Sequence, residues 1–589
     1  MGPIGLVLAS TALAVGTVTV RTPADAAPAP RPGDVADAAE LTWTAVVNNN
    51  DLIPPLGSRN FHSYNQPSVN LDGHVVVRAR SRGGTPAGPP IHGIYTRDMS
   101  VEGPIVSVLD RATAVPSPNN LGATIIETPS FPRIDMSTDT IATRANHEPV
   151  WRHLLDDGST TRTGTTGIYT NPFGPLITGA SGLGGVPEFD FFQVPGLPGV
   201  PFDVYPGSPS ITRGDTIVIK GNSTVEGIER TGVYFRELED GLAGGTAPVV
   251  RIADTASTTI PGTTTLFGST APPSAAGDLA VFAGFDDEDA PTRGGIYLAR
   301  LEPDPVLTEL VAIGDRVPGG ARTDTFRQLG EGVAFDGRFI GFWGAWGDRT
   351  RTLRLHCPTE GNRDRIDYCN QRLVCAGSGE ILGASDITCD QTGCYQDRQV
   401  PVDQGIFVHD IATRTTRGVA ATGETLDDFL YWSFSGRTPC SGGGHSSHGA
   451  ADVGETACWR SSAFVAVSGL VGATYRATFK ARSGELVDGA WVGATDGIHL
   501  RTGPGQGQPI KVVLDTTMDG TSLDPEAPVG SRITELGLER EGLRGNWLAV
   551  SAKMAIDGGT EDDGMAGVYT TLLDPPQGGG VGPQSRPDQ

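Results

Sequence analysis

Carboxylates at the ends of strand-like segments are the residues of this sequence best placed to do chemistry. Short apolar runs of one type end in or beside Asp110, Asp254, Asp315 and Asp515, and Asp51 follows the first such run. If these runs converge at one rim, their carboxylates could bind a cation or a polar ligand. The alternative, which we favour, is that each aspartate accepts hydrogen bonds from the turn that follows it.

Two acidic loops, 286–289 and 561–563, also carry the hard oxygen ligands that calcium prefers. Neither loop has EF-hand spacing, and exposed acidic loops are usually only solvated. The sequence therefore predicts no cofactor, with calcium as the alternative. Its ligands would be Asp286, Asp287, Asp289, Asp562 and Asp563.

Two pairs of histidines could bind a metal or act as a general base. His445 and His448 stand three residues apart in a glycine-rich loop, and His147 and His153 precede two aspartates at 156–157. No third ligand is evident for the first pair, so surface histidines are the favoured interpretation. The sequence contains no G-x-S-x-G, H-E-x-x-H or Walker-type signature. Any catalytic site must therefore be assembled from separate parts of the chain.

An aromatic cluster lies in the Pro- and Gly-rich segment 181–207. Its members are the candidate ligand-binding residues Phe189, Phe191, Phe192, Phe202 and Tyr205. Loops held by a rigid scaffold tend to carry function, so we expect this segment to help to bind a ligand.

Seven cysteines indicate disulfides rather than zinc. Five crowd the stretch from about 347 to 403, and two flank the loop 436–461; they are Cys357, Cys369, Cys375, Cys389, Cys394, Cys440 and Cys458. No CxxC pair is present, and clustered cysteines in an exported chain typically staple long loops. Cys440 and Cys458 are the most secure pair in this interpretation. An odd number leaves one thiol over or paired outside the chain.

These residues are positioned by a repeat. A short phrase recurs seven times, as HGIYTR (92–97), TGIYTN (166–171), TGVYFR (231–236), GGIYLA (294–299), QGIFVH (404–409), DGIHLR (496–501) and AGVYTT (566–571). Each copy follows an apolar strand and a tight-turn cluster, and six copies precede a further strand. With the strands called a, b, c and d in chain order, the phrase is strand c.

The strand count predicts an all-β fold, a seven-bladed β-propeller with four antiparallel strands in each blade. The seventh copy lacks its strand d, and TAVVNNND (44–51) at the start of the chain resembles one. We therefore expect this N-terminal strand to complete the last blade and close the ring. Stacked sandwiches or a β-helix would also show many short strands. The span 42–574 gives roughly 76 residues per blade, against about 40–50 in common propeller repeats, so the excess must lie in loops.

The b–c and d–a connections of a propeller open on one face, which we call the loop-rich face. Here they are long, whereas the a–b turns are mostly minimal. The loop-rich face is therefore the expected binding surface. The loop 436–461 is expected to be an exception. With 430–436 as strand a and 463–469 as strand b of blade 6, it is an a–b connection on the opposite face.

Composition and charge narrow the class of protein. The 589 residues include 81 Gly and 44 Pro, and the net charge of −24 repels nucleic-acid phosphates.

The apolar run at 4–20, followed by Ala24-Asp25-Ala26, predicts a signal peptide over 1–26, although no Lys or Arg precedes it. A linker (27–41) and a disordered tail (575–589) would flank the propeller, and no other segment could span a membrane. We expect a secreted or cell-surface protein.

The repeat resembles TolB-type and WD40-like propeller repeats, in which a Pro-Asp-Gly turn precedes one strand and an Ile-Tyr strand follows. It is closer to uncharacterised exported bacterial propeller-repeat proteins. SVNLDG (68–73) is the nearest equivalent of the turn. The resemblance implies the architecture and transfers no catalytic residue.

Two main functions remain open, beside a role in cell-surface adhesion or in a matrix, which differs from the first mainly in lacking a defined pocket. The first is a non-catalytic exported scaffold that binds a glycan, peptide or protein through the loop-rich face. The second is a cation-dependent hydrolase or lyase with its site at the mouth of the central channel. The absence of a catalytic motif favours the first.

Overall fold

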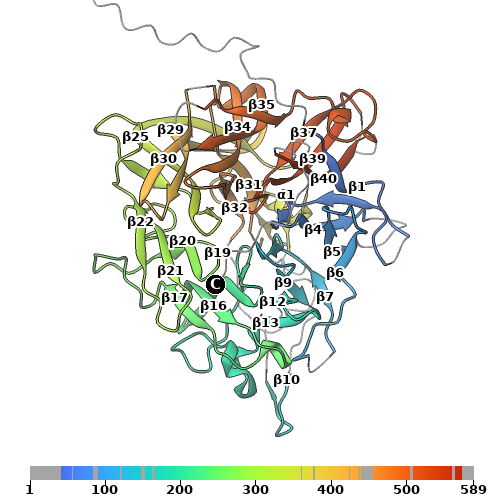
Figure 1. Ribbon diagram of the computed structural model, residues 1–589, viewed down its shortest axis with the longest axis vertical. Coiled ribbons are helices and arrows are strands. Elements are labelled where there is room, and N and C mark those ends of the chain that lie inside the picture. Colours follow the sequence, from blue (N-terminus) through green and yellow to red (C-terminus); the bar gives the residue numbers. More distant parts are fainter. Residues whose placement is uncertain are drawn as a thin grey trace, which may run out of the picture.

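The computed structural model is a ring of seven β-sheets around a central axis (Figure 1), which confirms the seven-bladed β-propeller. It describes residues 41–573 except 56–57, 84–89, 120–121, 148–152, 162–165, 360, 376–378, 424, 437, 440–455, 504–507 and 560–563. The expected signal peptide and C-terminal tail lie outside the described residues. Among those described, no helix has the length and apolar character needed to cross a bilayer.

Each blade is a four-stranded antiparallel sheet, and in five blades strand a is split in two. Blade 1 comprises β2 (Phe61–Tyr64), β3 (Ser68–Val69), β4 (His74–Ser81), β5 (His92–Asp98) and β6 (Val106–Asp110). Blade 2 comprises β7 (Ile125–Glu127), β8 (Arg133–Ile134), β9 (Ile141–His147), β12 (Thr166–Thr170) and β13 (Ile177–Ser181). Blade 3 comprises β14 (Ser210–Thr212), β15 (Thr216–Val225), β16 (Ile228–Glu237) and β17 (Val250–Asp254). Blade 4 comprises β18 (Ser269–Thr270), β19 (Ser274–Ala276), β20 (Leu279–Phe285), β21 (Gly294–Arg300) and β22 (Thr308–Ala312). Blade 5 comprises β23 (Phe326–Leu329), β24 (Ala334–Phe335), β25 (Phe339–His356), β29 (Gly393–Asp410) and β30 (Thr415–Ala421). Blade 6 comprises β33 (Val465–Gly469), β34 (Tyr475–Val487), β35 (Ala490–Gly503) and β36 (Lys511–Asp515). Blade 7 comprises β37 (Ser531–Gly537), β38 (Leu543–Arg544), β39 (Trp547–Ile556), β40 (Met565–Leu572) and β1 (Thr44–Asn48).

The N-terminal strand closes the ring, as the sequence predicts. β1 pairs antiparallel with β40, from Thr44 opposite Thr570 to Asn48 opposite Gly567. At the axis, the innermost strands β3, β8, β14, β19, β24, β33 and β38 each contact the next, and β38 contacts β3. The propeller therefore has no open end between its first and last blades.

The recurring glycine of strand c has a packing reason. In four blades the tyrosine two residues further on folds its ring back over the glycine. A β-carbon would lie only 2.5–2.8 Å from the tyrosine hydroxyl at Gly93, Gly167, Gly232 and Gly567. These tyrosines are almost fully buried. Gly-Ile/Val-Tyr is therefore a packing unit, and its recurrence made the fold predictable.

Serines of the inner strands join neighbouring blades. Ser68 donates to the carbonyl of Pro132 at 3.1 Å, and Ser274 donates to that of Val333 at 2.7 Å. Both serines are fully buried, so these bonds satisfy polar groups within the ring while linking blade 1 to blade 2 and blade 4 to blade 5.

Blade 6 corrects one expectation. The run 463–469, expected as strand b, contains β33, which is the innermost strand a. Strand b is β34, which begins with YRATFKAR and carries three cations, so it looks less apolar than β33 and pattern alone chose the wrong run. The loop 436–461 thus belongs to the connection between blades 5 and 6. It joins the hairpin of β31 (Tyr431–Ser435) and β32 (Cys458–Ser462), which lies on the loop-rich face, not on the opposite one.

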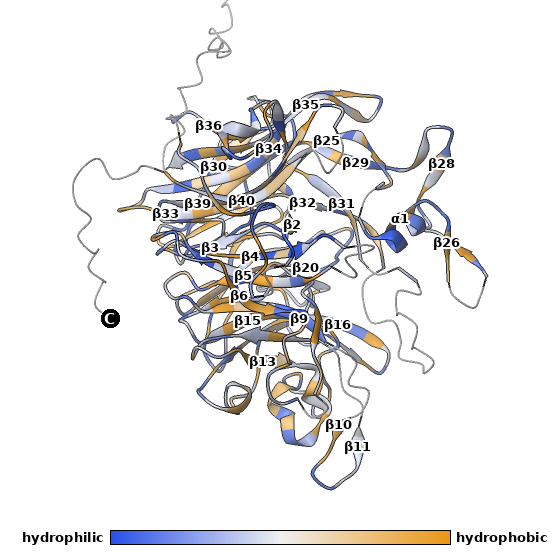
Figure 2. Ribbon diagram, turned by 90° about the vertical axis from the view of Figure 1, so that its right-hand side faces the viewer, coloured by the Kyte–Doolittle hydropathy of each residue, from blue (hydrophilic) through white to orange (hydrophobic). Residues whose placement is uncertain are grey.

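The long insertions project from one side of the ring (Figure 2). Blade 5 inserts α1 (Arg363–Cys369), β26 (Leu373–Val374), β27 (Ile381–Leu382) and β28 (Thr388–Asp390), and blade 2 inserts β10 (His153–Leu154) and β11 (Thr160–Thr161). Arg365 of α1 donates to the carbonyl of Gly436 at 2.9 Å, and Arg460 of β32 lies 3.7 Å from Glu288 of blade 4. The insertion and the hairpin therefore form one cap over blades 4 to 6. Elsewhere, 3-10 turns occur at η1 (Gly182–Gly185), η2 (Pro187–Phe192), η3 (Leu242–Gly244) and η4 (Gly520–Ser522).

Disulfides cross-link the cap, but one of the expected pairs does not form. Cys357 pairs with Cys369, and Cys389 pairs with Cys394. Cys375 is also disulfide-bonded. The expected pair of Cys440 with Cys458 is wrong, because Cys458 is a free thiol opposite Ser435 in the β31–β32 register. Cys440 itself lies outside the described residues.

Candidate functional site

Charged side chains fill the axis of the ring. The loop between β37 and β38 turns inward. Together with the last residue of β38 and one arginine of blade 2, it forms a cluster that we call the axial hub: Arg133, Glu539, Arg540, Glu541 and Arg544. All five are at most 8% exposed. Arg133 Nη2 lies 2.6 Å from Glu539 Oε1, which joins blade 2 to blade 7.

The axial hub also bonds to blades farther around the ring. Arg540 donates to the carbonyl of Pro272 in blade 4 at 3.1 Å, and Arg544 donates to that of Phe335 in blade 5 at 3.2 Å. The carbonyl of Glu541 accepts from Val69 of blade 1 at 3.0 Å. One loop of the last blade therefore holds blades 1, 2, 4 and 5 at the centre.

Electrostatics keep the axial hub ionised. Burial and the neighbouring Arg133 lower the pKa of Arg540 to about 10. Burial alone would raise the pKa of Glu539, but Arg133 and Arg540 outweigh it and the net shift is downward. These groups form ion pairs with one another and hydrogen bonds to backbone carbonyls, so the axis holds a buried cluster of charged side chains.

The aspartates that end the d strands bond to their own turns. Asp110 accepts from the amide of Ala112 at 2.9 Å, and Asp515 accepts from that of Thr517 at 2.8 Å. Asp254 accepts from Ser257 at 2.7 Å, and Asp315 accepts from Ala312 at 2.8 Å. The favoured interpretation, turn carboxylates, therefore describes these residues.

The acidic loop of blade 4 is organised in the same way. Asp286 accepts from the amides of Thr292 and Arg293 at 2.9 Å, and Asp287 accepts from Asp289 at 2.9 Å. Asp562 and Asp563 lie outside the described residues. Among the described residues, no group of three or more His, Cys, Asp or Glu side chains could hold a metal ion. Calcium stays an untested alternative.

The aromatic segment packs mainly into the protein. Phe192, Phe202 and Tyr205 are at most 1% exposed, so a ligand on the surface does not reach them. Phe189 and Phe191 are half-buried. The guanidinium of the fully buried Arg236 lies 5.1 Å from the ring centre of Phe191 and 5.0 Å from that of Phe192. The segment therefore covers the seam between blades 2 and 3, and two of its five aromatics keep accessible surface.

The candidate histidines are buried or undescribed. His147 and His153 are 6% and 5% exposed. The ring of His153 packs edge-on against Phe189 with centroids 5.6 Å apart, and burial lowers its pKa. His445 and His448 lie outside the described residues. His153 therefore belongs to the packing of the aromatic segment.

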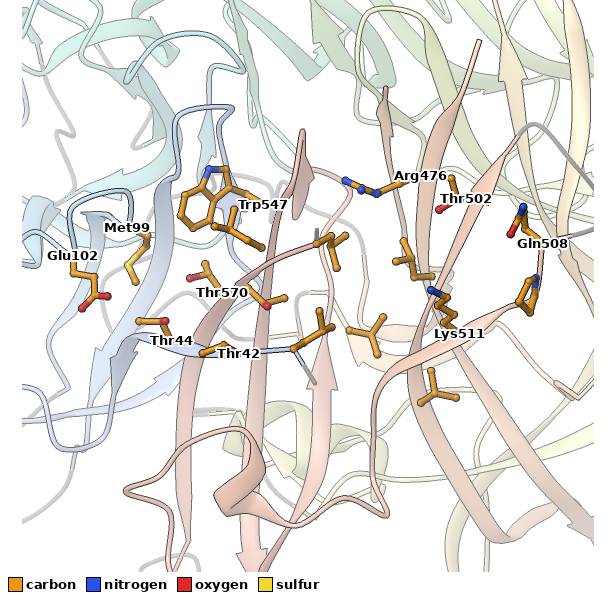
Figure 3. Close-up of a pocket in the computed structure, with 18 residues that line it drawn as sticks. Thr42, Thr44, Met99, Glu102, Arg476, Thr502, Gln508, Lys511, Trp547 and Thr570 are labelled. Atoms are coloured by element: carbon orange, nitrogen blue, oxygen red, sulfur yellow. The ribbon is translucent and has the colours of Figure 1, made fainter. Parts of the chain in front are cut away.

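A cavity of about 450 Å³ opens on the face opposite the loop-rich face, around the end of blade 7 (Figure 3). We call this face the plain face and the cavity the plain-face groove. Strand ends and turns of blades 1, 6 and 7 line it: Leu41, Thr42, Thr44, Met99, Glu102, Arg476, Leu500, Thr502, Gln508, Pro509, Lys511, Val512, Val513, Trp547, Thr570, Thr571, Leu572 and Leu573.

The plain-face groove has two differently composed ends (Figure 3). At the blade 1 end, Trp547 and Met99 lie near the hydroxyls of Thr44 and Thr570. At the blade 6 end, Arg476 and Lys511 lie near Thr502 and Gln508. The groove thus crosses the end of blade 7, which β1 completes, and an extended ligand could contact both ends of the groove.

Contacts with neighbouring turns and strands hold the side chains around the groove in place. The indole of Trp547 lies over the tight turn at Gly73, where a β-carbon would come within 2.6 Å of the ring. Arg476 is 5% exposed, and its Nη1 donates to Asn546 Oδ1 at 2.6 Å. Arg97 Nη1 donates to the carbonyls of Ala45 at 3.1 Å and Val46 at 2.9 Å, which covers the outer edge of β1.

Sequence reasoning did not find this site. Its residues come from strand ends in three blades and share no motif, and the a–b turns around them look minimal in sequence. The one available signal was Trp547, an aromatic directly after the turn RGN.

Comparisons with known proteins are distant. No family model matches the chain, and no curated protein matches it. The polysaccharide lyase Uly1 aligns with 49% of this chain and 55% of its own, at 11% identity and a TM-score of 0.25. The phage phi92 endosialidase aligns with 93% of this chain and 71% of its own, at 8% identity and a TM-score of 0.28. This chain spans about half the length of the lyase. At these TM-scores the likenesses carry no argument about function, and the similarity to TolB-type repeats stays a prediction.

Proposed function

We propose that this protein is an exported, non-catalytic propeller that binds an oligosaccharide in the plain-face groove. The observation that carries the proposal is the composition of the groove. A half-buried indole lies beside several threonine hydroxyls, and one exposed carboxylate, Glu102, is the sole acid among the described lining residues. An aromatic face with a few placed polar groups suits a sugar ring.

The same composition argues against hydrolysis in the groove. Glycosidases generally use two carboxyl groups about 5–9.5 Å apart, one as acid and one as base or nucleophile. The lining residues that the structure describes supply Glu102 alone, with no histidine or cysteine beside it. This composition supports binding without turnover.

A peptide added as an extra strand is a poorer occupant. Strand addition needs unpaired backbone groups on a sheet edge. Two edge strands, β1 and β36, contribute residues to the groove. At β1, Arg97 already donates to the carbonyls of Ala45 and Val46. A saccharide, which needs side-chain hydroxyls and no strand edge, fits the groove better.

Export is supported by the disulfides of the cap. Cys357–Cys369 and Cys389–Cys394 are bonds that persist in an oxidising compartment. Binding through the loop-rich face, where Phe189 and Phe191 keep some exposure, stays a prediction that no contact of the described residues tests.

A glycan array followed by calorimetric titration of the purified full chain tests the proposal. We expect a subset of oligosaccharides to bind, and Trp547→Ala and Gln508→Ala to weaken binding by about 1–3 kcal/mol each. Trp346→Ala is the matched control, because Trp346 is another half-buried tryptophan, in blade 5 and outside the groove. Absence of glycan binding, or binding that all three substitutions leave unchanged, would refute the groove as the site.

A further inference from the structure

The plain-face groove is charged in the opposite sense to the molecule. The chain has 68 acidic and 44 basic residues, a net charge of −24. The described residues that line the groove include two cations, Arg476 and Lys511, and one acid, Glu102. A concave site of locally positive charge raises the local concentration of anions.

The strand register places the two cations on one face of blade 6. Arg476 pairs with Thr502, and Lys511 pairs with Leu500. Thr502 and Leu500 are two residues apart on β35, and side chains at that spacing lie on one face of a sheet. Arg476 and Lys511 therefore lie on the same face of blade 6, on either side of β35.

The two cations differ in how they are held. Arg476 is almost fully buried, and its Nη1 donates to Asn546 Oδ1 at 2.6 Å and to the carbonyl of Gly545 at 3.4 Å. Lys511 is exposed at the mouth of the groove. A guanidinium held by hydrogen bonds and an exposed ammonium on a flexible side chain can both contribute to binding an anionic group.

Glu102 gives the groove a direction. It lies at the blade 1 end, on the side of Trp547 and away from Lys511 (Figure 3). A negative group of the ligand is therefore attracted to the blade 6 end and repelled from the blade 1 end, where the indole offers an uncharged surface.

From these positions we propose that the ligand is an anionic oligosaccharide, bound with a carboxylate or sulfate group at Lys511 and Arg476 and an uncharged sugar face against Trp547. The inference rests on the proposed saccharide function and names the class of saccharide. Carboxylates and sulfates share the chemistry that these cations recognise.

The test compares uronic-acid oligosaccharides with their methyl esters and with sulfated oligosaccharides, using the full chain. The methyl ester removes the charge and keeps the sugar. We expect an anionic form to bind at least about tenfold more tightly than its neutral match, since hydrogen bonds to charged groups are stronger than those to neutral groups. Lys511→Gln should remove most of that preference and Lys511→Glu should reverse it, whereas Lys553→Gln, which changes an exposed lysine of blade 7 outside the groove, should not.

The outcomes separate the two proposals. Preference for the uronate or for the sulfate identifies the anionic group and supports the inference. Equal binding of neutral and anionic forms, or a charge preference that Lys511→Gln leaves intact, overturns the inference while saccharide binding stands. Binding of no glycan of either kind overturns the proposed function and the inference with it.

Discussion

Asn48 in the first strand donates from Nδ2 to Oδ2 of Asp524 at 2.9 Å, across 476 positions of the sequence. The hydroxyl of Tyr569 donates to the same carboxylate oxygen at 3.0 Å. Asp524 is 2% exposed, so the ring closes on a buried polar lock between β1, β40 and the connection before blade 7.

Removing the shared acceptor should open this lock. Asp524→Ala leaves Asn48 and Tyr569 without their acceptor in a buried site, and we expect it to lower the free energy of unfolding by about 2–4 kcal/mol. Urea denaturation measures the effect. Glu526→Gln is the matched control, because Glu526 bonds to Asn50 at the surface and should change stability by less than about 1 kcal/mol. Equal effects would show that the lock does not stabilise the ring.

The axial hub should be sensitive to the loss of one partner. Arg133→Met leaves Glu539 buried beside fewer cations, and we expect a loss of about 3–5 kcal/mol in the free energy of unfolding. Arg213→Met, which breaks an exposed pair with Glu237, should cost at most about 1 kcal/mol. Replacing Arg133 and Glu539 together by apolar residues should restore part of the loss. A single variant as stable as the wild type would contradict a closed ionic axis.

Acid should weaken the pair of Arg338 and Asp410. Hydrogen bonds from Arg338 hold the pKa of Asp410 at about 2, below the ordinary 3.8. A depressed carboxyl pKa adds stability that is complete above the unfolded-state pKa and is lost as pH falls through the folded-state value. The stability difference between wild type and Asp410→Asn should therefore be constant above about pH 5 and shrink between pH 4 and 2. A difference independent of pH would refute this account.

Cys458 should be the thiol that reacts. It is free and partly exposed, whereas Cys357, Cys369, Cys375, Cys389 and Cys394 are disulfide-bonded. We expect alkylation of the native, unreduced protein to label Cys458, as read by peptide mass spectrometry, and Cys458→Ser to remove that label. Recovery of Cys458 in a disulfide-linked peptide with Cys440 would instead restore the pairing that the sequence suggested.

The sequence predicted the ring because the ring depends on local patterns. Gly567 and Tyr569 repeat the packing unit of strand c. Thr44–Asn48 resembles the d strands of the other blades and precedes the first blade. Blade 6 was misassigned because Arg476, Lys480 and Arg482 make β34 look less apolar than the adjacent β33, although β34 is the longer strand and is equally buried where it pairs with β33. Periodicity cannot rank such runs, and only packing in the closed ring does so.

The site escaped prediction for a different reason. Trp547, Lys511 and Thr44 belong to three segments that meet only when β1 joins β40, so no local pattern marks them. Glu539 and Arg540 likewise look like a solvated polar turn in sequence. Their burial follows from the inward course of the loop between β37 and β38, which is decided by the axis it must fill.

The most direct test is a crystal structure of the full chain with the oligosaccharide that binds most tightly on the array. We predict electron density across the end of blade 7, from Trp547 to Lys511, with every glycosidic bond intact. Density over the cap on the loop-rich face, or a cleaved sugar in the groove, would contradict saccharide binding without turnover at this site.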